Sequence, residues 1–194
     1  ARLTLSDLLR ANGDYEKAVQ ILGQLIGESR SPDWRLYYAR GAAFSLMDRW
    51  PEAEAGLIAA LKLRPDEPEL LNFLGYSWID RGERLPEALA MVEKAVAANP
   101  RSGAMIDSLG WAYYRMGDYK TAVEKLEQAV ELEAGDPEIN NHLGDAYWMV
   151  GRKDEAVFQW RRVLTLRPDD KIKADAERKL ASGQGPEAPR LATQ

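Results

Sequence analysis

Apolar residues follow the period of an α-helix in two consecutive stretches between Ile106 and Glu133. In each stretch they recur with helical spacing, mainly three and four residues apart, which places them on a single helical face. Gly117 stands between the stretches, where glycine readily adopts the left-handed conformation that ends a helix. The pattern therefore predicts two amphipathic helices joined by a tight turn. The face-forming residues are Ile106, Leu109, Gly110 and Tyr113, then Ala122, Val123, Leu126, Ala129 and Val130.

The same helical hairpin recurs along the chain at intervals of 34 or 35 residues. One hairpin has too little apolar surface to offset the entropy lost when it becomes ordered, so we expect neighbouring hairpins to stack. Four residue types recur in phase: a glycine, an aromatic ring, an alanine and a closing proline. They are Gly41, Gly75, Gly110 and Gly144; Phe44, Trp78, Tyr113 and Tyr147; Ala53, Ala88, Ala122 and Ala156; and Pro65, Pro100 and Pro168, with Ala134 at the remaining proline position.

This phase divides the chain into segments. We predict an incomplete repeat at 1–33, complete repeats at 34–67, 68–102, 103–136 and 137–170, and a charged capping helix at 171–181. Together, residues 1–181 form the predicted repeat array. Residues 182–194 are rich in Gly, Pro and Ala without periodicity, so we expect a disordered tail there. Because the apolar pattern begins almost at residue 1, we also expect further repeats upstream.

The recurring glycines have a packing role in this scheme. We expect Gly75, Gly110 and Gly144 to lie where the paired helix crosses, opposite the phased alanines. A larger side chain there should force the helix axes apart at a cost of about 1–3 kcal/mol. The repeats depart from the pattern in the turn of the first complete repeat, where Asp48 replaces glycine, and in the turn 82–87, which carries one extra residue.

Taken together, these phased residues resemble the tetratricopeptide repeat (TPR) family, in which leucine–glycine, an aromatic residue, alanine and a closing proline recur. The resemblance covers about residues 1–170, and Arg40 departs from it by replacing the leucine before Gly41. It implies an all-α fold: an α-solenoid, a right-handed superhelix of helix-turn-helix repeats with a C-terminal capping helix.

The resemblance also implies a binding surface, because the first helix of each repeat in this family lines a concave groove that holds ligand peptides. Large aromatic residues on an open face favour binding of apolar side chains, and asparagines can hydrogen-bond a peptide backbone. For Tyr114 and Trp148, packing against the adjacent repeat is an equal alternative. The candidate groove residues are Tyr38, Asn72, Tyr76, Ile79, Asp107, Trp111, Tyr114, Arg115, Asn141, Asp145 and Trp148.

Charge narrows the classes of partner. The net charge of −5 argues against a nucleic-acid partner, which requires a basic face. The first helices offer no lysine for a clamp on a ligand carboxylate. Their acidic residues Asp80, Asp107 and Asp145 outweigh the available cations, so a ligand with apolar side chains and some basic character is favoured. No apolar run approaches the eighteen residues that a membrane span requires.

The sequence offers little for catalysis. It has no cysteine, and its single histidine, His142, has no nucleophile partner in the sequence pattern, so we expect it at the groove edge or between helices. We expect the glutamates of the second helices to lie on the outer helix faces, where water solvates their charges. We therefore predict no catalytic residues, no metal site and no cofactor, and hence a protein that is not an enzyme.

The leading hypothesis is a non-catalytic scaffold that binds an extended peptide or partner segment in its groove. The alternative is a structural, self-assembling module that oligomerises through the ends of the array. Two segments resemble bacterial TPR proteins, which are often envelope lipoproteins and some of which act as adaptors. This resemblance implies a periplasmic or envelope-attached protein, with the cytoplasm as the alternative, and leaves open a lipid anchor upstream of Ala1. The segments are LGYSWIDRGERLPEALAMVEKAVAANP and INNHLGDAYWMVGRKDEAVFQWRRVL.

Overall fold

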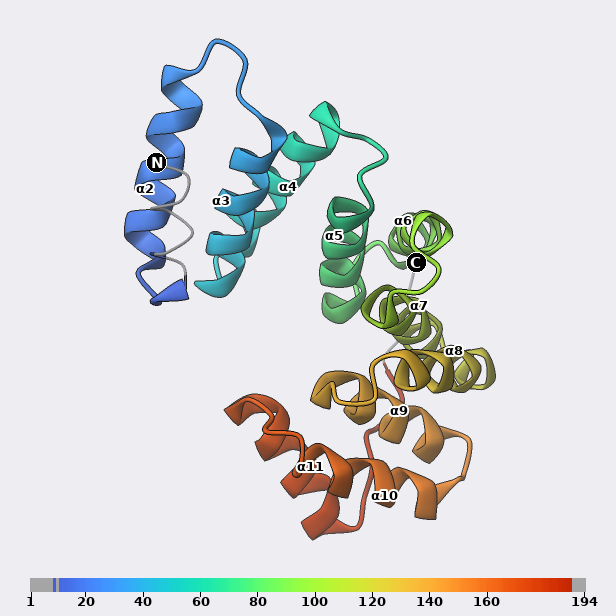
Figure 1. The fold of residues 1–194 in the computed structure, drawn as a ribbon. Helices are drawn as coiled ribbons and strands as arrows, with labels where there is room; N and C mark the ends of the chain where they lie inside the picture. The colour runs from blue at the N-terminus through green and yellow to red at the C-terminus, as the bar shows by residue number, and fades with distance from the viewer. Residues whose placement is uncertain (1–8, 10, 190–194) are drawn as a thin grey trace. The chain divides into compact units, whose positions relative to one another are not determined.

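The structure, a computed structural model, describes residue 9 and residues 11–189, and this part of the chain is all-α (Figure 1). Leu9 and Ala11 are helical, whereas the rest of the first predicted helix, at 1–8 and 10, lies outside the described residues. The helices are α2 (Tyr15–Glu28), α3 (Trp34–Leu46), α4 (Trp50–Leu63), α5 (Pro68–Arg81), α6 (Leu85–Ala98), α7 (Gly103–Arg115), α8 (Tyr119–Leu132), α9 (Pro137–Met149), α10 (Lys153–Val163) and α11 (Asp170–Ser182).

Helices α3–α10 form four consecutive hairpins, whose first helices begin at Trp34, Pro68, Gly103 and Pro137. These starts coincide with the repeat boundaries that the phase of the sequence predicts. Side chains cap several of the first helices: the Asp136 carboxylate, for example, accepts hydrogen bonds from the backbone N–H groups of Glu138 and Ile139. The predicted fold class, an all-α array of helical hairpins, is confirmed.

Left-handed residues close the turns inside the hairpins. Gly117 has a φ of +85°, a conformation that glycine adopts without a steric penalty. Asp48 takes the same role in the first complete repeat with a φ of 56°, since aspartate is among the residues that tolerate this region. In the longer turn before α6, Arg84 is also left-handed, with a φ of 47°. Both departures from the repeat pattern therefore lie in turns and leave the flanking helices intact.

The chain divides into two compact units, residues 1–74 and 75–194, with the division inside α5. In the first unit α3 packs against both α2 and α4. The contact between α3 and α4 is close: a Cβ added to Gly41 would lie 3.0 Å from the carbonyl oxygen of Ala53 and 3.1 Å from Leu57. Ala53 and Leu57 are fully buried at this crossing.

In the second unit each helix packs against its sequence neighbours from α6 to α11, and α9 also contacts α7 and α11. Ile106, Ala129 and Ile139 form a buried cluster between α7, α8 and α9. The predicted close crossings are present, but the side chain that opposes each glycine lies one turn beyond the phased alanine. Leu126 faces Gly110, and Trp160 faces Gly144.

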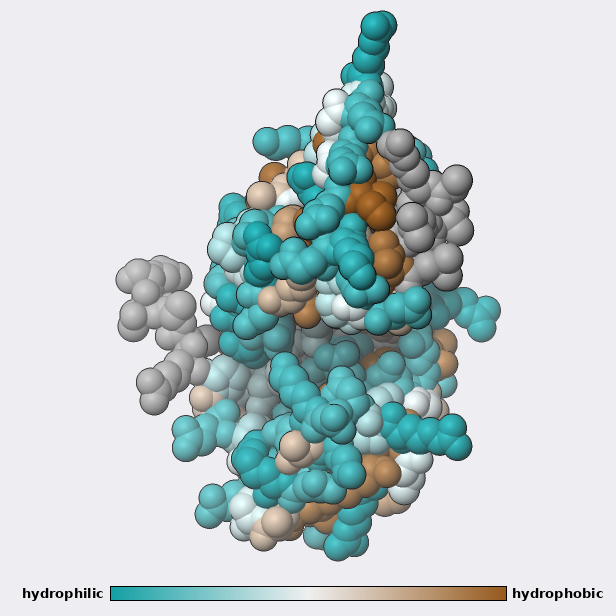
Figure 2. All heavy atoms as spheres, turned by 90° about the vertical axis from the view of Figure 1, so that its left-hand side faces the viewer, coloured by the Kyte–Doolittle hydropathy of each residue, from teal (hydrophilic) through white to brown (hydrophobic). Residues whose placement is uncertain are grey.

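The face shown in Figure 2 is mostly hydrophilic, and its hydrophobic residues lie in separate strips. Helix α11, predicted at 171–181 and observed at Asp170–Ser182, presents many of the charged residues of the C-terminal part. Gly183, in the left-handed conformation, ends it. Residues 183–189 continue without helix or strand, and residues 190–194 of the predicted disordered tail lie outside the described residues.

Candidate functional site

The candidate groove residues are divided between the two units. Tyr38 and Asn72 lie in the first unit, and both are half-buried. The Tyr38 ring packs edge-on against Phe73, with 5.8 Å between ring centroids. The side-chain oxygen of Asn72 is buried without a hydrogen-bond partner among the described residues. The remaining candidates belong to α5, α7 and α9 of the second unit.

Three rings stack in the second unit. Trp111 lies parallel to Tyr114 of the same helix, with 4.4 Å between centroids, and parallel to His142 of α9, with 4.0 Å between centroids. Only 9% of Trp111 and 2% of Tyr114 is exposed. The expectation that Trp111 lies on an open wall is therefore wrong, because its neighbours cover the indole by favourable ring stacking. Tyr114 is also buried, and it forms ring contacts with Trp111 and with Tyr119 of α8, both in its own repeat. Whether either residue contributes to binding stays a prediction.

His142 also holds a charge pair inside this stack. Its Nδ1 lies 3.0 and 3.1 Å from the two carboxylate oxygens of Asp107, and both side chains are buried. Burial lowers the pKa of His142, but the charge and hydrogen bond of Asp107, with Glu138 and Asp145 nearby, outweigh burial and raise the pKa to about 9. His142 is thus an interhelical residue, and it carries a positive charge at neutral pH.

This pair predicts a loss of stability at alkaline pH. Because the pKa of His142 is higher in the folded chain than its ordinary value of 6.5, its contribution is complete below about pH 6.5 and is lost as the pH rises through about 9. Between pH 7 and 10 we expect the melting temperature to fall by roughly 5 °C more in the wild-type chain than in a His142→Gln variant. Circular dichroism melts of both proteins measure this difference, and parallel pH profiles would contradict it.

Tyr76 and Glu138 form a second polar contact beside this pair. The Tyr76 hydroxyl donates a hydrogen bond to the Glu138 carboxylate at 2.6 Å, and the Tyr76 ring lies 6.3 Å from that of His142. Burial and the nearby Glu138 raise the pKa of Tyr76 far above its usual range, so the phenol stays protonated. Tyr76 is half-buried.

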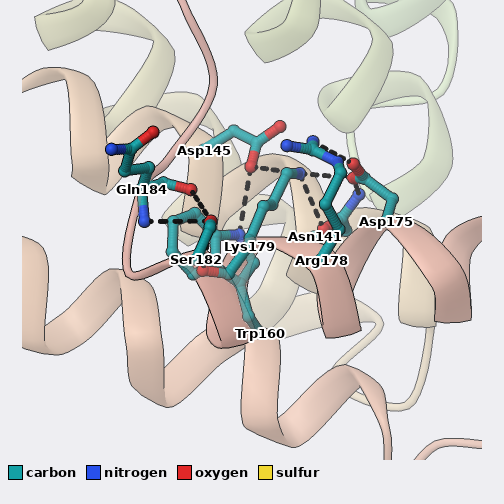
Figure 3. Close-up of polar contacts among 8 residues, drawn as sticks. All are labelled: Asn141, Asp145, Trp160, Asp175, Arg178, Lys179, Ser182 and Gln184. Carbon is teal, nitrogen blue, oxygen red and sulfur yellow. Dashed lines mark hydrogen bonds and ion pairs between the residues drawn. The ribbon is translucent and has the colours of Figure 1, made fainter.

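A buried lysine engages the polar candidates of α9 (Figure 3). Lys179 of α11, only 2% exposed, lies 2.5 Å from carboxylate oxygens of both Asp145 and Asp175. It also donates to the Asn141 side-chain oxygen at 3.2 Å, while the Asn141 amide donates to Asp175 at 3.0 Å. Asn141 and Asp145, expected along an open groove, therefore hold the capping helix, because they satisfy a cation that helix packing removes from water.

The environments of the two acids differ. Burial raises the pKa of Asp145 despite the adjacent Lys179. At half-buried Asp175 burial acts in the same direction, but hydrogen bonds from Lys179 and Asn141 outweigh it and lower the pKa. Lys179 was not among the residues predicted from the sequence. Its signal was present, because Lys179 falls in the apolar stripe of α11 with Ile172 and Ala176.

Trp148, the aromatic candidate of α9, is half-buried. The Lys153 ammonium lies 4.7 Å from its ring centroid, and the Trp160 ring lies 5.6 Å away at a tilt of 38°. Its third neighbour is Gly185, whose backbone lies so close that an added Cβ would overlap the indole. The C-terminal segment of the chain thus packs directly on a candidate groove residue.

The two remaining candidates have other environments. Ile79, expected to line the groove, is fully buried and belongs to the core. Arg115 is half-buried, and its guanidinium donates a hydrogen bond to the backbone carbonyl of Asp80. Arg115 thus joins the end of α7 to the end of α5 and is already engaged within the second unit.

Two polar atoms in the ring stack have no partner. The indole N–H of Trp111 and the hydroxyl of Tyr114 are buried and form no hydrogen bond within residues 9 and 11–189. Buried polar groups are nearly always paired, so two neighbouring unpaired groups on one helix call for an explanation. Their chemistry suits hydrogen bonds to acceptors such as peptide carbonyl oxygens.

This region brings together aromatic rings, amides and paired charges. Such groups are suited to non-covalent binding of another molecule. Among the described residues, no three or more His, Cys, Asp or Glu side chains are grouped to hold a metal ion. Every described helix falls short of the length and apolarity needed to cross a membrane.

Comparison with known families identifies the repeat type. Models described as tetratricopeptide repeat match residues 1–29, 47–103 and 137–170, and a model described as TPR repeat matches residues 110–151. A similar curated protein is the TPR repeat-containing protein PA4667 of Pseudomonas aeruginosa. It is 33% identical over 141 residues, which cover 72% of this chain and 23% of that protein.

Two further proteins extend this comparison. The peroxisomal targeting signal receptor of Saccharomyces cerevisiae is 22% identical over 128 residues, covering 66% of this chain and 20% of the receptor. The crystal structure of TTC0263, a thermophilic TPR protein of Thermus thermophilus, has a TM-score of 0.75 at 24% identity and covers 93% of this chain and 97% of that one. The chain spans about a fifth to a quarter of the two curated relatives.

Proposed function

The chain belongs to the tetratricopeptide repeat family, and from that premise we propose that it is a non-catalytic scaffold that binds an extended segment of a partner protein. Repeats of this family generally mediate contacts between proteins. The binding surface that we propose lies in the second unit, along the first helices α7 and α9.

One observation carries this proposal: a segment without helix or strand already lies on a groove candidate, since Gly185 packs on the indole of half-buried Trp148. A surface that accepts one stretch of backbone in this way is suited to accept another of the same chemistry.

The comparisons give a weaker form of support. One relative is by name a peroxisomal targeting signal receptor. We propose recognition of the same general kind here, without carrying over the identity of the signal. We also propose that the protein is periplasmic or attached to the cell envelope and acts there as an adaptor. Cell fractionation of the full-length protein tests this location.

Selection of displayed peptides on the purified chain tests the function. We expect peptides that bind the wild-type protein to lose at least about tenfold in affinity for a Trp148→Ala variant, because that change removes the ring on which the ligand rests. Phe158→Ala is the matched control, since Phe158 is an aromatic residue of α10 that is 61% exposed and was not predicted to bind. Calorimetry with the synthetic peptides gives both affinities.

Two other results would be informative. Equal affinity for the wild-type protein and Trp148→Ala would overturn binding at this surface. If no peptide binds and the chain instead forms oligomers that depend on concentration, the self-assembly alternative replaces the proposal. Light scattering at several concentrations distinguishes these cases, and melting curves verify that both variants remain folded.

A further inference from the structure

The segment after α11 has the features of a ligand held by its own chain. Ser182 holds the start of this segment: its hydroxyl oxygen accepts from the N–H of Gln184 and lies 3.3 and 3.2 Å from the backbone carbonyl oxygens of Lys179 and Gln184, to either of which it can donate its proton. Gly183, with a φ of 63°, reverses the chain direction. Figure 3 shows Ser182 and Gln184 at this turn, next to the buried Lys179. The hydrogen bonds of Ser182 and the conformation of Gly183 therefore fix the path of the segment as it leaves α11.

Burial differs from residue to residue along the segment, and Gly185 on the Trp148 ring is half-buried. Pro186 and Pro189 are half-buried, whereas Glu187 and Ala188 between them are exposed. A polyproline II helix has three residues per turn, so it presents positions i and i+3 on the same side. Two prolines at this spacing, with fixed φ angles, favour an extended segment of this kind. The segment thus presents one side to the protein and one to solvent.

Gly185 explains why this segment fits Trp148. Its backbone lies against the indole where any side chain would overlap the ring. Aromatic surfaces are the usual platforms for proline-rich segments, which enter the complex with little further loss of conformational entropy. The surface on α9 therefore selects extended backbone with glycine at the ring and proline beside it.

We propose that residues 183–189 are a built-in occupant of the Trp148 surface, and that the partner segment which displaces them is itself extended and contains glycine and proline. This inference rests on the proposed function and adds to it a ligand class and a means of regulation. A segment tethered to its site has an effective concentration in the millimolar range, so even weak affinity keeps it seated. A partner must compete with it.

A single substitution tests this competition in the full chain. Gly185→Leu places a side chain where the indole lies and should displace the segment without altering any helix. We expect selected peptides to bind this variant roughly three- to tenfold more tightly than the wild type, because the tethered competitor is gone. Gly135→Leu is the matched control, since Gly135 has no atom within 4 Å of an added Cβ.

A second experiment supplies the occupant in trans. A chain ending at Gln184 keeps every described helix, and a blocked synthetic peptide of residues 183–189 serves as the probe. We expect this peptide to change the tryptophan fluorescence of the shortened chain with a dissociation constant of about 0.1–0.5 mM, the range in which a tethered concentration of about 1 mM competes three- to tenfold. It should also displace selected peptides. The same peptide with Gly185→Leu should do neither.

The outcomes separate this inference from the function on which it rests. If selected peptides bind the wild type and Gly185→Leu equally, and the peptide of residues 183–189 has no effect, the built-in occupant is disproved while peptide binding stands. If no peptide binds the wild type, the Gly185→Leu variant or the chain that ends at Gln184, the proposed function itself fails. Selected peptides that lack both glycine and proline would overturn the ligand class alone.

Discussion

Replacing Lys179 by alanine is expected to lower the stability of the second unit by about 3–5 kcal/mol. The Lys179 ammonium is buried between Asp145 and Asp175, and its removal leaves the Asp145 carboxylate without its cation in a site that excludes water. An uncompensated buried charge costs far more than the lost ion pair contributed. We expect α11 to detach from α9 before the rest of the unit unfolds. Urea unfolding measures the loss of stability, and limited proteolysis of α11 measures its detachment.

The Lys179→Ala effect has a matched control and a dependence on pH. Lys173 lies on the same helix and is exposed, so Lys173→Ala should change stability by less than about 0.5 kcal/mol. Burial already raises the pKa of Asp145, and without Lys179 its neutral form is favoured further. The destabilisation should therefore be smaller at pH 4 than at pH 7. Equal losses in both lysine variants would contradict the assigned role.

Gly144→Ala is expected to cost roughly 3 kcal/mol, at the upper end of the range for overpacking. A Cβ at this position would lie 2.5 Å from Nε1 and 2.6 Å from Cδ1 of Trp160. Trp160 is fully buried, and its indole N–H donates to Asp145 at 3.0 Å, so the ring cannot move aside without losing that bond. Urea unfolding followed by tryptophan fluorescence gives the difference in free energy.

Two other glycine variants provide a comparison for the free-energy cost of Gly144→Ala. Gly110→Ala meets the Leu126 side chain, which can adopt another rotamer, so a smaller loss of about 1–2 kcal/mol is expected. Gly135→Ala, with open space around it, should be nearly neutral or slightly stabilising. The assignment of Gly144 to a rigid crossing fails if the three alanine variants are equally stable.

Much of the fold was predictable from the sequence because its determinants are local and repeated. The phased glycines and the turn residue Gly117 specify where each helix ends and where two helices cross. Even the substitution at Asp48 preserved the left-handed turn, since the backbone requirement persists when glycine is replaced. Repetition makes such signals reliable, because each element is specified several times.

The candidate site was less predictable because exposure depends on contacts between helices that the repeat pattern leaves undefined. The family geometry assigns Trp111 to an open face, but a histidine in the next repeat covers its second side. That contact depends on the identity of one residue, His142, which is unrelated to the phase. Asn141 and Asp145 are likewise engaged because α11 carries a lysine in its apolar stripe.

The C-terminal segment was the least predictable part, since composition alone indicates disorder there. Gly, Pro and Ala give no helical or strand period, and the contact of Gly185 with Trp148 joins residues that lack any pattern in common. Sequence patterns report how a segment organises itself. They do not report a backbone that takes its conformation from a ring 37 positions earlier in the chain.

The stacked imidazole between α7 and α9 has a practical consequence. His142 is the only histidine in the chain, so its ring protons give one unambiguous pair of signals in a proton NMR spectrum. Its neighbours, one indole and one carboxylate, shift those signals by ring current and by charge. The protein therefore contains an intrinsic spectroscopic reporter at the junction of two repeats, which registers any slippage between them without a label.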